Sequence, residues 1–110
     1  MPIQWGTVTD NRRTSTRHTV SITVKVTVDG ALRDATMVNL SLGGAQVETG
    51  TKHAMGQRMQ IVFKVPTLAE PIEVGAVVRW TDGNGAGLQF DGLRARDVWA
   101  LNEYFKQLSQ

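Results

Sequence analysis

Hydrophobic and polar residues alternate strictly from Val20 to Val28, where each valine or isoleucine is followed by Ser, Thr or Lys. This period of two is typical of a β-strand with one face toward a core. Val, Thr and Ile number 13, 12 and 4 among the 110 residues. These side chains are branched at Cβ and favour strands. The chain is therefore predicted to be mostly β, and an all-helical bundle is nearly excluded.

Turn signals divide the rest of the chain into short segments with strand character. Asp29-Gly30 is typical of a tight hairpin, and Gly43-Gly44 interrupts the next apolar stretch. In addition to residues 20–28, the pattern predicts strands at 32–40, 45–48, 57–65, 72–80 and 87–90. Six short antiparallel strands with turns between them favour a closed or nearly closed barrel. His53 falls in a predicted turn and is expected to be solvated.

The periodicity changes near the C-terminus. Apolar residues there follow helical spacing and predict an amphipathic helix over about 94–108 that covers one opening or one edge of the barrel. The predicted buried stripe consists of Val98, Leu101, Phe105 and Leu108. The aromatic residues Trp99, Tyr104 and Phe105 are expected to pack. The fold class is thus all-β with one helix, a six-stranded antiparallel β-barrel plus a C-terminal α-helix, with residues 1–18 as a flexible arginine-bearing leader and 19–110 as the folded domain.

Charge and composition limit the classes of function. The formal net charge of +2 arises within residues 1–17, because the rest of the chain holds equal numbers of basic and acidic residues. The chain has no Cys and two His, so thiolate chemistry and a metal centre are poorly supplied. It has no signal-peptide pattern and no apolar run long enough to span a membrane. We expect a cytoplasmic, non-enzymatic domain without a cofactor or metal.

Two local motifs carry the functional signal. The first is Arg13-Thr-Ser-Thr-Arg17, an R-x-x-x-R sequence directly preceded by Arg12. The second begins at Asn39 and continues Leu-Ser-Leu-Gly to Gly44, an N-x-S-x-x-G sequence between two predicted strands. Each motif alone is weak, and the second taken alone is more typical of a turn stabilised by its own side chains. In this order, on either side of a hairpin, the two motifs together are much more specific.

With both motifs, the chain resembles the PilZ domain family, whose members bind the bacterial second messenger cyclic di-GMP. The family signature is R-x-x-x-R followed by D/N-x-S-x-x-G, and its fold is a six-stranded antiparallel β-barrel with a C-terminal helix. The segment Gly85-Ala-Gly-Leu-Gln-Phe90 is similar to a late strand of the family. The resemblance covers about residues 11–108.

The resemblance implies a set of residues that bind cyclic di-GMP. Arginine can pair bidentately with phosphate or with guanine O6 and N7, while Asn and Ser supply donors and acceptors and glycine permits close backbone approach. Arg12 is similar to a family position that influences stoichiometry, where arginine accompanies a stacked pair of ligands. Asn39 stands where many members have aspartate, which predicts weaker charge-assisted pairing. The implied ligand-binding residues are Arg12, Arg13, Arg17, Asn39, Ser41, Gly43 and Gly44, with Trp80 as a further candidate for stacking.

Three functions remain open. The first is a cyclic di-GMP receptor that acts as an adaptor on an unidentified effector protein in motility, pilus function, polysaccharide secretion or biofilm formation. The second is a PilZ adaptor that works without ligand. The third is a small barrel that binds single-stranded nucleic acid, which the low aromatic content and the neutral barrel segment disfavour. We therefore expect no DNA or RNA partner, and a monomer or a ligand-dependent dimer.

Overall fold

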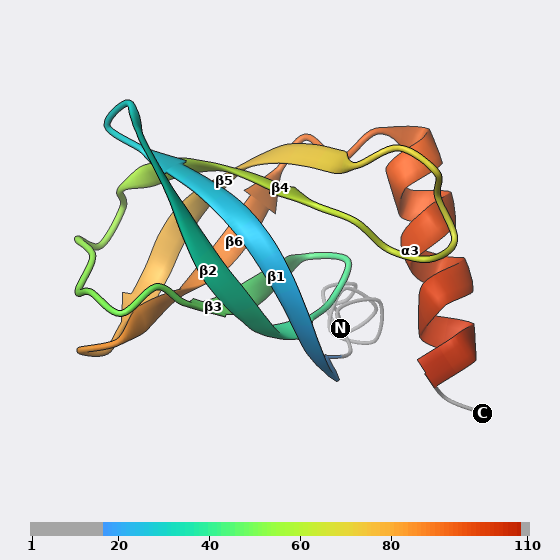
Figure 1. Ribbon diagram of the computed structural model, residues 1–110, viewed down its shortest axis with the longest axis horizontal. Coiled ribbons are helices and arrows are strands. Elements are labelled where there is room, and N and C mark those ends of the chain that lie inside the picture. The colour runs from blue at the N-terminus through green and yellow to red at the C-terminus, as the bar shows by residue number, and fades with distance from the viewer. Residues whose placement is uncertain (1–16, 109–110) are drawn as a thin grey trace, which may run out of the picture.

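A computed structural model describes residues 17–108 as one closed barrel and one helix. The strands, all paired antiparallel, follow each other around the barrel in the order β1-β2-β3-β6-β5-β4. Helix α3 (Ala95–Leu108) stands at one end, opposite the β1–β2 hairpin (Figure 1). The predicted fold class is confirmed. The strands are β1 (His18–Val28), β2 (Ala31–Leu40), β3 (Gly44–Glu48), β4 (Arg58–Phe63), β5 (Ile72–Thr81) and β6 (Gly85–Asp91).

The alternating pattern of the sequence builds the interior of the barrel. Val24 and Val26 of β1 are fully buried, and Met59, Ile61 and Phe63 point inward from β4. The β1–β2 turn uses Asp29 and Gly30 at φ of 51° and 79°, a left-handed pair that matches the twist of a two-residue hairpin. These features follow the sequence prediction closely, because side-chain period and turn chemistry are both local properties of the chain.

The barrel closes through a short contact between β1 and β4. The two strands are in register only from Lys25 to Thr27 of β1, opposite Val62 to Gln60 of β4. The earlier part of β1 pairs with β2 alone within the described residues. Beyond that paired edge, His18 stacks on Phe105 of α3, with ring centroids 4.2 Å apart. The first residue of β1 therefore contacts the C-terminal helix directly.

Helix α3 presents a somewhat different face to the barrel than its apolar residues predict. Its buried residues are Asp97, Ala100, Leu101 and Phe105. Leu108, predicted to be buried, is 39% exposed, and Trp99, expected to pack, is 57% exposed. The predicted stripe was thus wrong in part, because a carboxylate and a small alanine occupy the contact with the barrel end.

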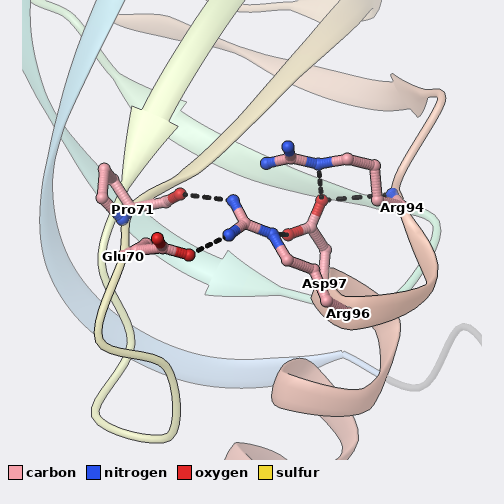
Figure 2. A network of polar contacts seen from close by, with 5 residues as sticks. All are labelled: Glu70, Pro71, Arg94, Arg96 and Asp97. Atoms are coloured by element: carbon pink, nitrogen blue, oxygen red, sulfur yellow. Dashed lines mark hydrogen bonds and ion pairs between the residues drawn. The ribbon is translucent and has the colours of Figure 1, made fainter.

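Asp97 explains why α3 turns a different face to the barrel. Its side chain contacts the start of the helix and, through Arg96, a neighbouring loop. Its Oδ2 accepts hydrogen bonds from the backbone N–H of Arg94 at 3.1 Å and from Arg94 Nε at 3.3 Å. Its Oδ1 lies 3.4 Å from Arg96 Nε, and the Arg96 guanidinium also contacts Glu70 and the carbonyl of Pro71 (Figure 2). A side chain that returns to the helix start in this way satisfies backbone donors that the helix itself leaves free.

His53 is not solvated as its predicted turn suggested. It is 8% exposed, and its Nε2 lies 2.6 Å from Thr49 Oγ1. The turn prediction was correct for the backbone, but the loop folds back so that the imidazole packs beneath it. A hydroxyl partner makes this burial tolerable for a polar ring.

Candidate functional site

Cross-strand register places Asn39 of the second motif and Trp80 in one row of residues around the barrel. Asn39 of β2 is opposite Thr19 of β1 on one side and Gln46 of β3 on the other. Gln46 is in turn opposite Gly87 of β6, which is opposite Trp80 of β5. The row therefore crosses five strands, beginning two residues after Arg17 and ending at Trp80.

Three register shifts adjoin this row, the first of them between Thr19 and Ile22 of β1. The register of β2 with β3 shifts between Met37 and Asn39, and that of β5 with β6 shifts between Val78 and Trp80. An extra residue on one strand interrupts the inward–outward alternation and redirects the side chains that follow. In β5 the residues up to Val78 alternate regularly, so Trp80 would point inward without the bulge. It is instead 38% exposed.

Hydrogen bonds connect the side chains of Arg17, Asn39 and Gln46. Arg17 Nη1 donates to Asn39 Oδ1 at 2.8 Å, and Asn39 Nδ2 donates to Gln46 Oε1 at 2.8 Å. The amide of Asn39 thus uses both of its ends, one to hold the guanidinium and one to fix its own orientation. Gln46 was not predicted from the sequence, because its place beside Asn39 follows from strand register and not from a local motif.

The Ser41–Gly44 segment is a compact loop organised by the serine hydroxyl. Ser41 Oγ accepts the backbone N–H groups of Gly43 and Gly44 at 3.2 and 3.1 Å, and the Ser41 N–H donates to the Gly44 carbonyl at 2.8 Å. The serine is 4% exposed. Its hydroxyl therefore stabilises the loop itself, and the loop presents the backbone of Gly43 at the surface while Gly44 is buried.

Trp80 lies against the backbone of β6. A Cβ atom added to Gly87 would be 2.0 Å from Trp80 Nε1 and 2.2 Å from its Cε2. Glycine is thus required at position 87 for the indole to lie where it does. The same close approach explains the Gly-x-Gly pattern in β6, because a Cβ at Gly85 would lie 2.0 Å from the carbonyl oxygen of Val47.

These elements enclose a surface hollow of about 640 Å³. Among the described residues that line it there are two arginines and no acidic side chain, so the hollow is electropositive and suited to an anion. An exposed indole and bare glycine backbone complete its surface. The lining residues are Arg17, Ser41, Gly43, Gly44, Arg79, Trp80, Gly87, Leu88 and Gln89.

Most of the residues predicted for the site come together at this hollow. Arg17, Ser41, Gly43, Gly44 and Trp80 line it, and the predicted Asn39 is bonded to Arg17. The predicted residues Arg12 and Arg13 lie outside the described part of the chain. Arg79 and Gln89 belong to the lining but were not predicted, because neither lies in a sequence motif and their place depends on strand pairing and on the bulge in β5.

Residues 17–108 provide neither a metal site nor a membrane-spanning helix. No group of three or more His, Asp or Glu side chains there is arranged to hold a metal ion. None of the described helical structure has the length and apolar character to cross a membrane. Residues of both sequence motifs, Arg17 of the first and Ser41, Gly43 and Gly44 of the second, line the hollow.

Comparison with known proteins agrees with this geometry. The model of the PilZ domain family matches residues 11–107, nearly the whole chain, including both motifs, the six strands and all of α3 but its last residue. The chain belongs to the PilZ domain family. A comparison with curated proteins found no match.

Two solved structures share the fold. The Bacillus subtilis inhibitor of motility MotI/DgrA superimposes with a TM-score of 0.75 at 24% identity, covering 90% of this chain. This chain spans about half of that protein, 53% of its length. The PilZ domain of CeSA from a cellulose-synthesising bacterium gives a TM-score of 0.66 at 16% identity, covering 84% of this chain and 98% of that domain.

Proposed function

We propose that this chain is a cyclic di-GMP receptor that acts as an adaptor on another protein. The observation that carries the proposal is the meeting of the two motifs in one hollow. Arg17 of the first motif is hydrogen bonded to Asn39 of the second and lines the same hollow as Ser41, Gly43 and Gly44. Membership of the PilZ family supports the same ligand.

The chemistry of the hollow suits a molecule with two phosphates and two guanines. The Arg17 guanidinium can form two parallel hydrogen bonds with phosphate or with a guanine edge. The indole of Trp80 can stack on a purine face. The glycine backbone of the loop allows a flat base or a phosphate to approach closely. In the proposal, Arg12 and Arg13 complete the site from the leader, and Arg12 favours a stacked pair of ligands.

Signal output in this proposal depends on the arginine leader. Ligand in the hollow would draw the leader onto the barrel, and the closed form would present a new surface to an effector protein. No nucleophile–base pair or cofactor is needed for this role. The processes we propose are motility, pilus function, polysaccharide secretion or biofilm formation, in the cytoplasm. Structural likeness to an inhibitor of motility and to a domain from a cellulose-synthesising bacterium supports this range.

Isothermal titration with cyclic di-GMP tests the proposal, with GMP as the control ligand. We expect micromolar or tighter binding, a free energy of about −8 kcal/mol or better. The Arg13→Ala/Arg17→Ala double variant should lose binding because it removes both arginines of the R-x-x-x-R motif, while its circular dichroism stays unchanged. Arg33→Ala/Lys52→Ala, two cations that line another hollow at the β1–β2 end of the barrel, is the charge-matched control and should bind normally.

Each outcome of the titration has a defined meaning. Two ligands per chain would support the role proposed for Arg12, and one ligand per chain would count against it. Binding retained by a folded double variant would overturn the site. A folded wild-type chain that does not bind would move the assignment to a ligand-independent PilZ adaptor. Binding of single-stranded DNA that collapses with salt would instead favour the nucleic-acid barrel.

A further inference from the structure

Arg79 occupies an unusual position in β5. Val78 is in register with Leu88 and Trp80 with Gly87, so Arg79 is an additional residue with no register partner in β6. Consecutive residues of a regular strand point to opposite faces, yet Arg79 and Trp80 are both exposed. The bulge therefore places a guanidinium and an indole side by side on the outside of the barrel.

The Arg79 guanidinium is held in place by Gln89. Arg79 Nε donates to Gln89 Oε1 at 2.6 Å, and Gln89 is in register with Gly44 of the serine loop. Arginine carries five N–H donors, so this bond uses one and leaves the four on the two η nitrogens for other partners. Both residues line the hollow of about 640 Å³ and also the adjoining one of about 210 Å³.

An arginine beside a tryptophan is suited to reading one particular base. When a purine base stacks on the indole, a guanidinium beside the indole can reach the edge of that base. Guanine offers two acceptors there, O6 and N7, which match the paired N–H groups of arginine. Adenine has an amino group, a hydrogen-bond donor, in place of O6. The N–H groups of the same arginine would therefore face another donor.

We propose that Arg79 binds the O6–N7 edge of the guanine stacked on Trp80 and thereby selects guanine over adenine in the ligand. Gln89 is its positioning residue, since it holds the Nε side of the guanidinium and aims the η nitrogens. This proposal rests on the proposed function, and it adds a residue outside both sequence motifs. Arg58, whose Nη2 pairs with Asp91 Oδ2 at 2.6 Å, lines only the smaller hollow and offers a matched control.

Titration of four proteins with three ligands tests this assignment. The proteins are wild type, Arg79→Ala, Gln89→Ala and Arg58→Ala. The ligands are cyclic di-GMP, its 7-deaza analogue, which lacks the N7 acceptor, and cyclic di-AMP, which has an amino group in place of O6 and whose disadvantage relative to cyclic di-GMP should shrink in Arg79→Ala. Arg79→Ala should weaken cyclic di-GMP binding by between about 5-fold and 150-fold, the range of one bidentate base contact. Gln89→Ala should have a smaller effect, and Arg58→Ala none.

The 7-deaza analogue separates base reading from general charge. It should bind wild type several-fold more weakly than cyclic di-GMP, and this difference should shrink in Arg79→Ala and, in part, in Gln89→Ala. A full deaza penalty retained in Arg79→Ala, or unchanged binding of cyclic di-GMP by that variant, would overturn the role of Arg79 while leaving the receptor function intact. Failure of wild type to bind cyclic di-GMP would overturn the receptor function and this role with it.

Discussion

Glycine at position 44 is required by the distance between two backbones. A Cβ atom there would lie 1.9 Å from the carbonyl oxygen of Leu88, and it would lie 3.0 Å from the Leu88 carbonyl carbon. Neither atom belongs to a flexible side chain, so β3 or β6 would have to shift. The last glycine of the second motif therefore has a packing role in addition to any contact with ligand.

Gly44→Ala is expected to lower the free energy of unfolding by about 1–3 kcal/mol or more, the usual cost of forcing atoms into a packed contact. Urea unfolding of the purified domain measures it. Gly83→Ala is the matched control, because no atom lies within 4 Å of its added Cβ and its φ is not positive; it should stay within about 0.5 kcal/mol of wild type. Equal losses in the two variants would contradict the packing role.

Some residues of the site could be predicted from the sequence, and others could not. Arg17, Asn39 and the serine loop could be predicted because each belongs to a short motif. Arg79 and Gln89 could not, since their place in the hollow depends on a bulge and on pairing between strands far apart in sequence. The exposure of Trp80 has the same cause: alternation places it inside the barrel, and the bulge between Val78 and Trp80 turns it outward.

At the scale of elements, the strands were predictable and the helix face was only partly so. Period-two alternation is a property of each strand alone, and it indicated the inward residues of β1 and β4 correctly. The helix was located by its apolar spacing, which takes no account of a buried carboxylate. Asp97 is fully buried. Its Oδ2 accepts hydrogen bonds from Arg94 and its Oδ1 forms an ion pair with Arg96, and we infer that these contacts fix the rotation of α3 on the barrel end.

Asp97→Ala is expected to destabilise the domain by about 1.5–3 kcal/mol, because it removes charge-assisted hydrogen bonds and the acceptor for a helix-start N–H. Thermal or urea unfolding measures the loss. Glu103→Ala removes the exposed Lys106–Glu103 pair of the same helix and should change stability by less than about 1 kcal/mol. An Asp97→Ala variant as stable as Glu103→Ala would show that the network contributes little.

For the molecule as a whole, the order of the elements and the family could both be predicted, since six strands, one helix and two motifs are visible in the sequence. The strand order around the barrel needed the structure. The loop around His53 also needed it, because a turn signal does not say whether a side chain packs beneath the turn.

The intact domain should gain stability when it binds its ligand. A ligand that binds only the folded state at 100 times its dissociation constant stabilises it by about 2.7 kcal/mol, which for a domain of this size raises the thermal midpoint by about 10 °C or more. Differential scanning fluorimetry with cyclic di-GMP measures this shift. The Arg13→Ala/Arg17→Ala variant should show none, and GMP should leave wild type unchanged.

The short register between β1 and β4 separates two kinds of motion in this barrel. The middle of β1 has a neighbour on each side and can open only together with the barrel, whereas its beginning has one paired neighbour within the described residues. Local opening there costs less than global unfolding. Arg17 and the His18–Phe105 stack both lie at this end. The start of β1, between the hollow and helix α3, can therefore open and close locally while the rest of the barrel stays folded.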